Sequence, residues 1–198
     1  MRNNSFWTKN LSFIDKILSK LRFKKVLDNI DLENKTIIDT WSWYNADLLR
    51  YIKKEYDIKD AIAYDIKLNK TFLENHWIRY IEWDLNYWID LKKKVDVVFS
   101  TAIIEHLENP KNYIKSVYDI LKKDWYLILT VPSTYSKPVL EFMAYNLKII
   151  DKEEILDHKK YYDKKGILNL LVWVWFKNQN IHHKYFQFFM NNYCIAKK

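Results

Sequence analysis

Short apolar runs alternate with amphipathic stretches over most of this 198-residue chain. Residues 36–40 have the length and apolar content of a buried strand, whereas residues 46–56 place apolar side chains at the three- and four-residue spacing of a helix. Strands joined through helices form parallel sheets with right-handed crossovers. The alternation therefore predicts an α/β fold of Rossmann-like, doubly wound form, with a mostly parallel seven-stranded sheet. The predicted strands are 36–40, 61–65, 78–82, 95–100 and 126–131, and the predicted helices are 46–56, 68–75, 110–122 and 164–172.

Both ends of the chain add to this core. Residues 11–30 carry apolar side chains at helical spacing and predict one or two amphipathic helices. We therefore divide the chain into an N-terminal helical lid or cap, 1–33, and a main domain, 34–198. Near the other end, we expect the segments 176–183 and 185–196 to pair as an antiparallel hairpin at the edge of the sheet.

Charge and composition narrow the choice of partners only slightly. The net charge is +8, but the basic residues are scattered rather than gathered in one run, so nucleic acid is an allowed but not a favoured partner. The longest apolar stretch, 168–176, is about half of the ~20 residues that cross a bilayer, so no membrane span is predicted. A single cysteine, Cys194, and the lack of an uninterrupted apolar signal core predict a cytoplasmic protein.

Glycine is almost missing from the sequence. A chain of this length has about 14 glycines at the usual share of ~7%, but this one has a single glycine, Gly166, and nine tryptophans. Several of the tryptophans stand at predicted turns between strands and helices. Glycine is the usual residue there, because the backbone must turn tightly or adopt a positive φ. The turns thus carry the bulkiest side chain in place of the smallest.

The loop after the first predicted strand has a family pattern. Residues 39–45 read Asp-Thr-Trp-Ser-Trp-Tyr-Asn. With glycine at Trp41 and Trp43, they resemble the cofactor-binding loop D-x-G-x-G-x-G of class I S-adenosylmethionine-dependent methyltransferases in all but the third glycine. Four further tryptophans stand where that family or its turn chemistry favours glycine, with a left-handed helix stop expected at the third: Trp77, Trp83, Trp125 and Trp175. We infer that the gene uses UGA for glycine and has been translated with UGA as tryptophan.

The resemblance implies S-adenosylmethionine as the cofactor. Asp65, at the end of the second strand, corresponds to the acid that accepts hydrogen bonds from both ribose hydroxyls, and a surface acid that caps the next helix is the alternative. Asp84 and Leu85 correspond to the adenine contact, with an exposed loop acid as the alternative for Asp84. The other assigned residues form the loop or face the methionine end. The implied cofactor-binding residues are Asp39, Trp41, Ser42, Trp43, Asp65, Asp84, Leu85, Ser100 and Thr101.

The loop after the fourth strand carries the candidate chemistry. Glu105 and His106 precede a helix that starts at Pro110, and this loop resembles the one that borders the acceptor in small-molecule methyltransferases. His106 and the later His158 are the candidate catalytic residues, because imidazole exchanges protons near neutral pH. A structural role in the loop is the alternative for both. No cysteine and histidine cluster has metal-ligand spacing, so no metal site is predicted.

Three functions are compatible with these patterns. An S-adenosylmethionine-dependent methyltransferase acting on a small-molecule or lipid-like acceptor leads, because of the loop after the fourth strand. An RNA methyltransferase is the alternative that the positive charge supports. A non-catalytic protein with a methyltransferase fold leads instead if Trp41 and Trp43 are genuine, since their two indole rings would fill the cofactor pocket.

Overall fold

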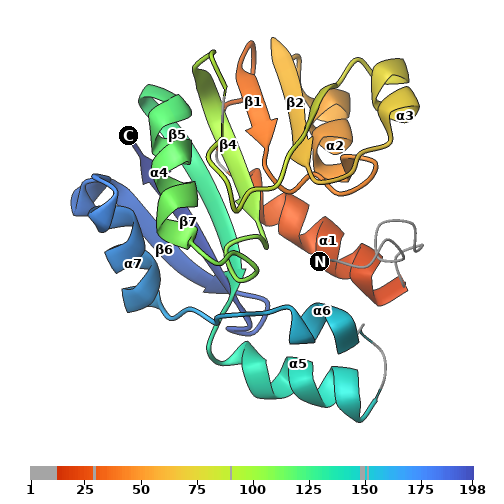
Figure 1. Cartoon of the computed structure of the whole chain (residues 1–198), viewed down its shortest axis with the longest axis vertical. Coiled ribbons are helices and arrows are strands. Elements are labelled where there is room, and N and C mark those ends of the chain that lie inside the picture. The colour runs from red at the N-terminus through yellow and green to blue at the C-terminus, as the bar shows by residue number, and fades with distance from the viewer. Residues whose placement is uncertain (1–12, 29, 90, 148–149, 151) are drawn as a thin grey trace.

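The computed structural model describes residues 13–28, 30–89, 91–147, 150 and 152–198. They form a seven-stranded sheet in the order β3-β2-β1-β4-β5-β7-β6 (Figure 1). The first five strands in sequence pair in parallel, whereas β7 pairs antiparallel with both β5 and β6. The strands are β1 (Thr36–Asp39), β2 (Asp60–Asp65), β3 (Arg79–Glu82), β4 (Val95–Thr101), β5 (Leu121–Pro132), β6 (Ile181–Phe186) and β7 (Asn191–Lys197).

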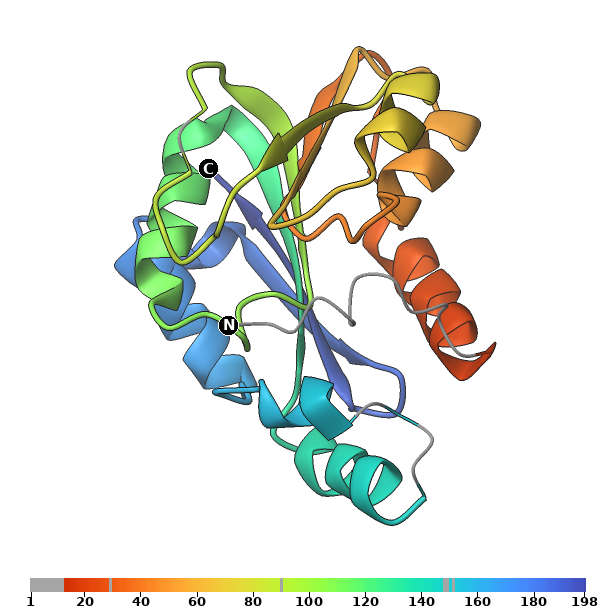
Figure 2. The same cartoon turned by 45° about the vertical axis from the view of Figure 1, so that its right-hand side comes forward.

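Helices cover both faces of this sheet (Figures 1 and 2). The pair α4 and α7 packs together on one face, and α1, α2 and α3 lie on the other. The helices are α1 (Phe13–Val26), α2 (Asp47–Glu55), α3 (Lys70–Asn75), α4 (Pro110–Ile120), α5 (Ser136–Tyr145), α6 (Lys152–Leu156) and α7 (Lys164–Trp173). The predicted doubly wound, mostly parallel fold is confirmed.

The central strands feed two hydrophobic cores. In β4, Val98 belongs to the core under α4 and α7, whereas Val97 and Phe99 belong to the core under α1 and α2. Neighbouring residues of a strand point to opposite faces, so a strand covered on both sides must be apolar at every position. This is the physical reason why continuous apolar runs identified the parallel strands.

Two capping side chains set the first residues of α4 and α7. Asn109 accepts a hydrogen bond from the backbone N of Asn112 at 3.3 Å, and Pro110 occupies the first turn of α4, where its missing N–H is not needed. Asp163 caps α7 in the same way, accepting from Gly166 N at 2.7 Å. The loops after β4 and before α7 therefore end at defined points.

The boundary between α4 and β5 differs from the prediction. The helix ends at Ile120, and the strand begins at once with Leu121 rather than at residue 126. The pairing of β4 with β5 shifts register between Val95 and Val97, which allows the earlier start. The predicted left-handed position was wrong by one residue, because Asp124 has φ 68° and Trp125 does not adopt a positive φ.

The C-terminal hairpin forms as predicted, but with a different turn. Residues 176–180 are not part of a strand, and β6 starts only at Ile181 after a short 3-10 helix, Asn178–Asn180. The turn lies between Phe186 and Asn191 instead of at residue 184. Three consecutive residues of this turn adopt a positive φ. Hydrophobic alternation predicts the strands of a hairpin but not the backbone conformation of its turn.

The predicted lid is described only in its second half. Residues 1–12 lie outside the described residues, and α1 crosses the face of the sheet near the carboxyl end of β1 (Figure 1). At the far end of the molecule, α5 and α6 pack against each other beyond β5 (Figure 1). Within the described part of the chain, every helix is too short or too polar to cross a membrane.

Candidate cofactor site

The candidate site lies at the carboxyl ends of β1, β2 and β4. The strand order reverses at β1, since β2 adds on one side of it and β4 on the other. Loops leave such a switch point in opposite directions, and the crevice between them is where ligands bind in open α/β sheets. The loop that follows β1 at this point, residues 40–46, is named the cofactor loop below.

Ser42 fixes the middle of the cofactor loop. Its Oγ donates to the backbone O of Asp39 at 2.6 Å and accepts from the backbone N of Tyr64 at 3.0 Å. A single buried hydroxyl thus ties the loop to both β1 and β2. Ser42 also lines the cavity described below.

Asp65 holds the next turn of the cofactor loop. Its side chain is fully buried, and its Oδ2 accepts a hydrogen bond from the backbone N of Trp43 at 2.9 Å. Its Oδ1 accepts from the backbone N of Ile66 at 2.6 Å. Hydrogen bonds to a carboxylate are stronger than those between neutral groups. The burial excludes the surface-acid alternative for Asp65, and its ribose contact stays a prediction.

Asp39 places a second buried carboxyl beneath the cofactor loop. Burial raises the pKa of Asp39 to about 7, and the nearby charge of Asp65 adds to the increase, whereas the hydrogen bond from Trp41 N opposes it. That bond is long, 3.4 Å to Oδ1. A carboxyl with a pKa near neutrality gains its full charge most readily when a cation lies beside it. The position favours a positively charged ligand group.

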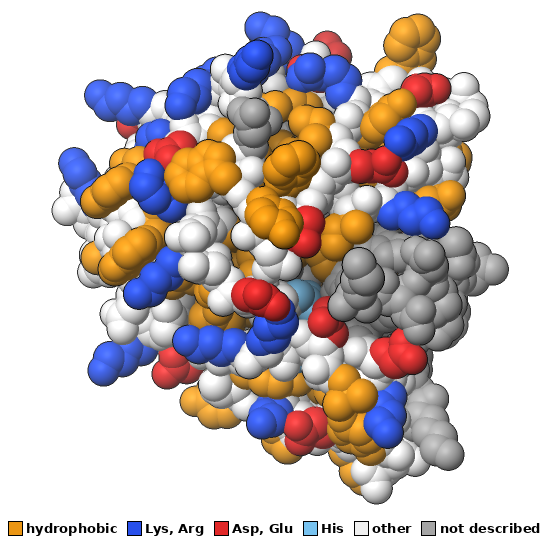
Figure 3. All heavy atoms as spheres, viewed as in Figure 1, with side chains coloured by type: hydrophobic (Ala, Val, Ile, Leu, Met, Phe, Trp, Pro, Cys, Tyr) orange, Lys and Arg blue, Asp and Glu red, His pale blue; other side chains and the backbone are white. Residues whose placement is uncertain are grey.

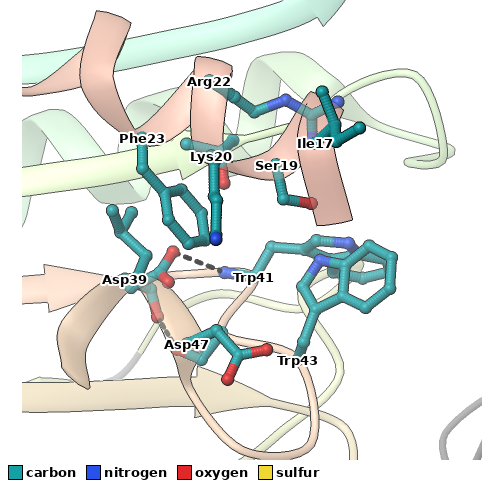
Figure 4. A pocket seen from close by; sticks show the side chains of 12 residues that line it. Ile17, Ser19, Lys20, Arg22, Phe23, Asp39, Trp41, Trp43 and Asp47 are labelled. Atoms are coloured by element: carbon teal, nitrogen blue, oxygen red, sulfur yellow. Dashed lines mark hydrogen bonds between the residues drawn. The ribbon is translucent and has the colours of Figure 1, made fainter. Parts of the chain in front are cut away.

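A cavity of about 400 Å³ opens between the cofactor loop and α1 (Figure 4). Ser19 and Phe23 of α1 form its upper side, and Asp39 lies below them. The indole rings of Trp41 and Trp43 stand together at one end of it. The lining residues are Ile17, Ser19, Lys20, Arg22, Phe23, Asp39, Trp41, Ser42, Trp43, Asp47, Leu48 and Thr101.

A cluster of titratable side chains lies beside the cofactor loop. Glu105 and His106, both buried, come from the loop after β4, and His158 follows α6. Their ligand atoms all lie within 4.8 Å of one another. The ring of His106 stacks on that of Trp41, with centroids 5.4 Å apart. Figure 3 shows a histidine in a hollow near the centre of this face, with acidic and basic side chains around it.

Comparison with known proteins gives this site a family. A family profile described as "Methyltransferase domain" matches residues 23–189, which is most of the chain. The chain belongs to the methyltransferase domain family. No curated protein sequence matches the chain. Membership implies S-adenosylmethionine as the cofactor.

Solved structures show the same fold at low sequence identity. An S-adenosylmethionine-dependent methyltransferase from Mesorhizobium loti has a TM-score of 0.65 and 10% identity over 90% of this chain and 96% of its own. The pyocyanin biosynthetic protein PhzM has a TM-score of 0.67 and 9% identity over 91% of this chain and 55% of its own. The small RNA methyltransferase HEN1 reaches 0.69 and 15% identity over 96% of this chain and 27% of its own.

Within this methyltransferase domain, the end of β4 separates two residues that the sequence grouped together. Thr101 lines the cavity, but Ser100 is fully buried and its Oγ accepts a hydrogen bond from Tyr113 Oη of α4 at 2.7 Å. Tyr113 Oη also lies 2.5 Å from Thr40 Oγ1. Adjacent strand residues face opposite sides, so Ser100 braces the sheet against α4 instead of lining this cavity.

The predicted adenine contact follows β3. Leu85 is buried in the core under α4 and α7. Asp84 is half-buried, and its Oδ1 accepts from both the backbone N and the side-chain Nδ2 of Asn86, at 2.9 and 3.0 Å. This arrangement is an Asx turn, which shapes the loop locally. Neither residue lines the cavity under α1, and their contact with adenine stays a prediction.

The tryptophans of the methyltransferase domain fall into two structural groups. Trp43, Trp77 and Trp175 adopt the left-handed conformation, with φ of 58°, 54° and 76°. Only glycine adopts it without penalty, and any other L-residue pays about 1–2 kcal/mol. Trp77 is also 85% exposed, although tryptophan is highly buried on average. These three positions bear out the turn chemistry that suggested glycine, whereas Trp41 and Trp83 do not have positive φ.

Proposed function

We propose that this domain transfers the methyl group of S-adenosylmethionine to a small-molecule or lipid-like acceptor. The observation that carries the proposal is the pair of buried carboxyls, Asp39 and Asp65, on either side of a left-handed turn at the switch point of the sheet. The cofactor joins a cationic sulfonium and ammonium to a ribose diol. A carboxylate suits each of these groups, as a counter-charge and as an acceptor.

Asp39 and Asp65 would divide this work. Asp39 lines the cavity and would face the methionine end, where the positive charge of the ligand stabilises its ionised form. Asp65 would accept the ribose hydroxyls while its Oδ2 keeps the hydrogen bond to Trp43 N. The reaction itself is an in-line displacement at an activated methyl carbon. The main task of the protein is therefore to orient the acceptor and exclude water.

The cofactor fits the backbone of the site but not two of its side chains. The indoles of Trp41 and Trp43 project into the cavity that the ligand would occupy. Glycine at both positions would open the pocket, and at Trp43 it would also relieve the left-handed strain. We therefore keep the proposal that UGA encodes glycine here. The active form would carry glycine at both positions, and the chain with both tryptophans would be the non-catalytic alternative.

We assign the acceptor to the side of the cavity that α1 forms, opposite Asp39. α1 covers the cavity with Ile17 and Phe23, which supports a small or lipid-like acceptor. Lys20 and Arg22 line the same cavity and favour the RNA alternative, since they offer positive charge for phosphate. Basic side chains on the face in Figure 3 are spread over several elements instead of forming one patch. This distribution supports the small-molecule assignment.

The experiment compares two forms of the full chain by calorimetry with S-adenosylmethionine. We expect the double variant Trp41→Gly, Trp43→Gly to bind S-adenosylmethionine at least about 100-fold more tightly than the chain with both tryptophans, because two bulky rings leave the pocket. Trp173→Gly, at the exposed end of α7, is the matched control and should leave affinity unchanged. Equal affinity of the double variant and of the chain with both tryptophans for S-adenosylmethionine would contradict the proposal.

The codons of the gene and an assay of methyl transfer to RNA separate the small-molecule, RNA and non-catalytic alternatives. UGG codons at positions 41 and 43 would overturn the recoding and favour a non-catalytic protein. Salt-sensitive binding of RNA to the double variant, with transfer of a labelled methyl group to that RNA, would replace the small-molecule acceptor with RNA. Transfer to small hydroxyl, amine or lipid-like acceptors is the result that the proposal expects.

A further inference from the structure

The cluster of Glu105, His106 and His158 joins two loops that are far apart in sequence. The backbone O of Glu105 accepts a hydrogen bond from the backbone N of Lys159 at 2.8 Å, which brings the loops together. Glu105 is only 1% exposed and His106 8%, whereas His158 is half-buried. One carboxylate and two imidazoles therefore converge, with donor atoms within 4.8 Å of one another.

The ring of His106 is held from behind by an acid. Its Nδ1 lies 2.9 Å from Asp157 Oδ2, a residue adjacent to His158. The other ring nitrogen, Nε2, is then the one that His106 offers to the cluster. Metal-binding histidines almost always make such a second contact to a carboxylate or carbonyl, which fixes the ring and its tautomer. His158 has a comparable contact, with Nδ1 3.1 Å from Tyr161 Oη.

The electrostatics of the cluster favour a bound cation. A carboxylate as deeply buried as Glu105 is stable when it is hydrogen-bonded or lies beside positive charge. Two neutral imidazoles and a carboxylate carry one negative charge in total. A divalent ion placed between them would be neutralised in part by the carboxylate and ligated by nitrogen. Imidazole ligands suit first-row transition metals better than Ca²⁺ or Mg²⁺, which prefer oxygen.

We propose that Glu105, His106 and His158 form a binding site for a divalent transition-metal ion such as Mn²⁺, Co²⁺ or Zn²⁺, with Asp157 as the positioning residue for His106. Two histidines and one carboxylate leave coordination positions for further ligands. His106 stacks on Trp41 of the cofactor loop, so the proposed metal site lies beside the proposed cofactor site. An acceptor with a hydroxyl oxygen is the substrate class that such an ion would hold, a step that rests on the proposed function.

This assignment changes the role of the two histidines. A ring that ligates a metal through Nε2 and contacts a carboxylate through Nδ1 has no nitrogen left to accept a proton. His106 would therefore serve as a ligand instead of the general base that the sequence suggested. The sequence marked all three residues as candidates for the acceptor site or for catalysis, but it predicted no metal site, because His158 comes from a separate loop and the three lack a short ligand motif.

The test titrates chelator-treated full-length chain with Co²⁺ and Zn²⁺, without S-adenosylmethionine. We expect one equivalent of metal to bind, to raise the unfolding temperature, and to produce visible Co²⁺ absorption bands of nitrogen and oxygen coordination. His106→Asn, His158→Asn and Glu105→Gln should each weaken binding at least about tenfold. Asp157→Asn should weaken it by about 10- to 100-fold and leave the ligand set of the Co²⁺ spectrum unchanged.

Matched controls exclude surface binding. His76→Asn removes an exposed histidine at the C-cap of α3, and Glu108→Gln removes an exposed acid whose surface ion pair with Lys159 contributes little, so both should bind metal like the parent. Unchanged metal affinity in His106→Asn and His158→Asn would overturn the proposal. Circular dichroism identifies a variant that fails to fold, and the Co²⁺ spectrum of the unmodified chain then decides alone. No metal-dependent band and no thermal shift in that chain would also overturn it.

The metal site and the proposed function can fail separately. Calorimetry of S-adenosylmethionine with the glycine double variant in excess chelator tests cofactor binding without metal. Metal titration of the same variant without cofactor tests the cluster without the cofactor. Metal binding without cofactor binding would support the metal site and overturn the methyltransferase proposal. Cofactor binding without metal binding would support the methyltransferase proposal and overturn the metal site.

Discussion

The cofactor loop and the turn between β6 and β7 solve the same backbone problem with different consequences. Both reverse the chain with left-handed residues that are not glycine, Trp43 in the first and Phe188 and Phe189 in the second. In the hairpin turn the aromatic side chains lie in solvent, with Phe188 97% exposed. In the cofactor loop the indole lines a cavity over buried acids. Equal backbone strain therefore affects stability alone at one turn, and both stability and ligand binding at the other.

The largest expected difference between the two turns concerns pH. Because burial raises the pKa of Asp39 to about 7, the folded chain keeps a proton that the unfolded chain releases near pH 4. We expect the free energy of unfolding to fall as the pH rises from about 4 to 7, by an amount on the order of 2–4 kcal/mol. Urea denaturation across this range measures it. Asp39→Asn should remove this component, whereas Phe188→Gly should retain it.

The same titration has the opposite sign for ligand binding. A cationic methionine end is attracted by ionised Asp39, so cofactor affinity of the glycine double variant should fall as the pH drops below about 7. Calorimetry at several pH values checks the slope, which approaches tenfold per pH unit when one proton is displaced. A flat profile, or the same slope in Asp39→Asn, would remove Asp39 from the cofactor site.

The two acids at opposite ends of β2, Asp65 and Asp60, test whether cofactor binding depends on the acid beside the cofactor loop. In the glycine double variant, Asp65→Asn should weaken cofactor binding by about 10- to 100-fold, because it removes a charged acceptor facing both the loop and the proposed ribose. Asp60→Asn at the opposite end of β2 breaks only the surface ion pairs with Arg79 and Lys93 and should not change affinity. An equal effect of the two substitutions would mean that Asp65 supports the fold only.

The smallest expected effect compares the two strained turns directly. Trp43→Gly and Phe188→Gly should each stabilise the fold by about 1 kcal/mol, since glycine accepts positive φ without a Cβ conflict. Only Trp43→Gly should also raise cofactor affinity. Thermal denaturation and calorimetry on the same samples measure both quantities. A gain in cofactor affinity with Phe188→Gly would break the comparison.

Local sequence patterns predicted most of the fold and part of the site. The apolar runs located β1, β2 and β4, because a strand covered on both faces must be apolar throughout. The family pattern and turn chemistry marked Trp43, Trp77 and Trp175 as glycine positions, and all three have a positive φ. The left-handed conformation expected at Trp125 is instead found at Asp124, which lies in the segment of β5 where the pairing with β4 shifts register. Pairing between strands decides such details, and no local pattern records it.

What the sequence by itself determined was the alternation of the five parallel strands with their helices, the C-terminal hairpin and the family of the chain, whereas the helices α5 and α6 after β5 were not predicted. Periodicity and motif spacing are written along the chain, so they are legible before it folds. The tertiary structure alone decided that Ser100 faces α4 while Thr101 faces the cavity, and that burial shifts the pKa of Asp39. It also brought His106 to Asp157, 51 residues away in the sequence. These features arise from contacts between distant segments, which exist only once the sheet and its loops have assembled.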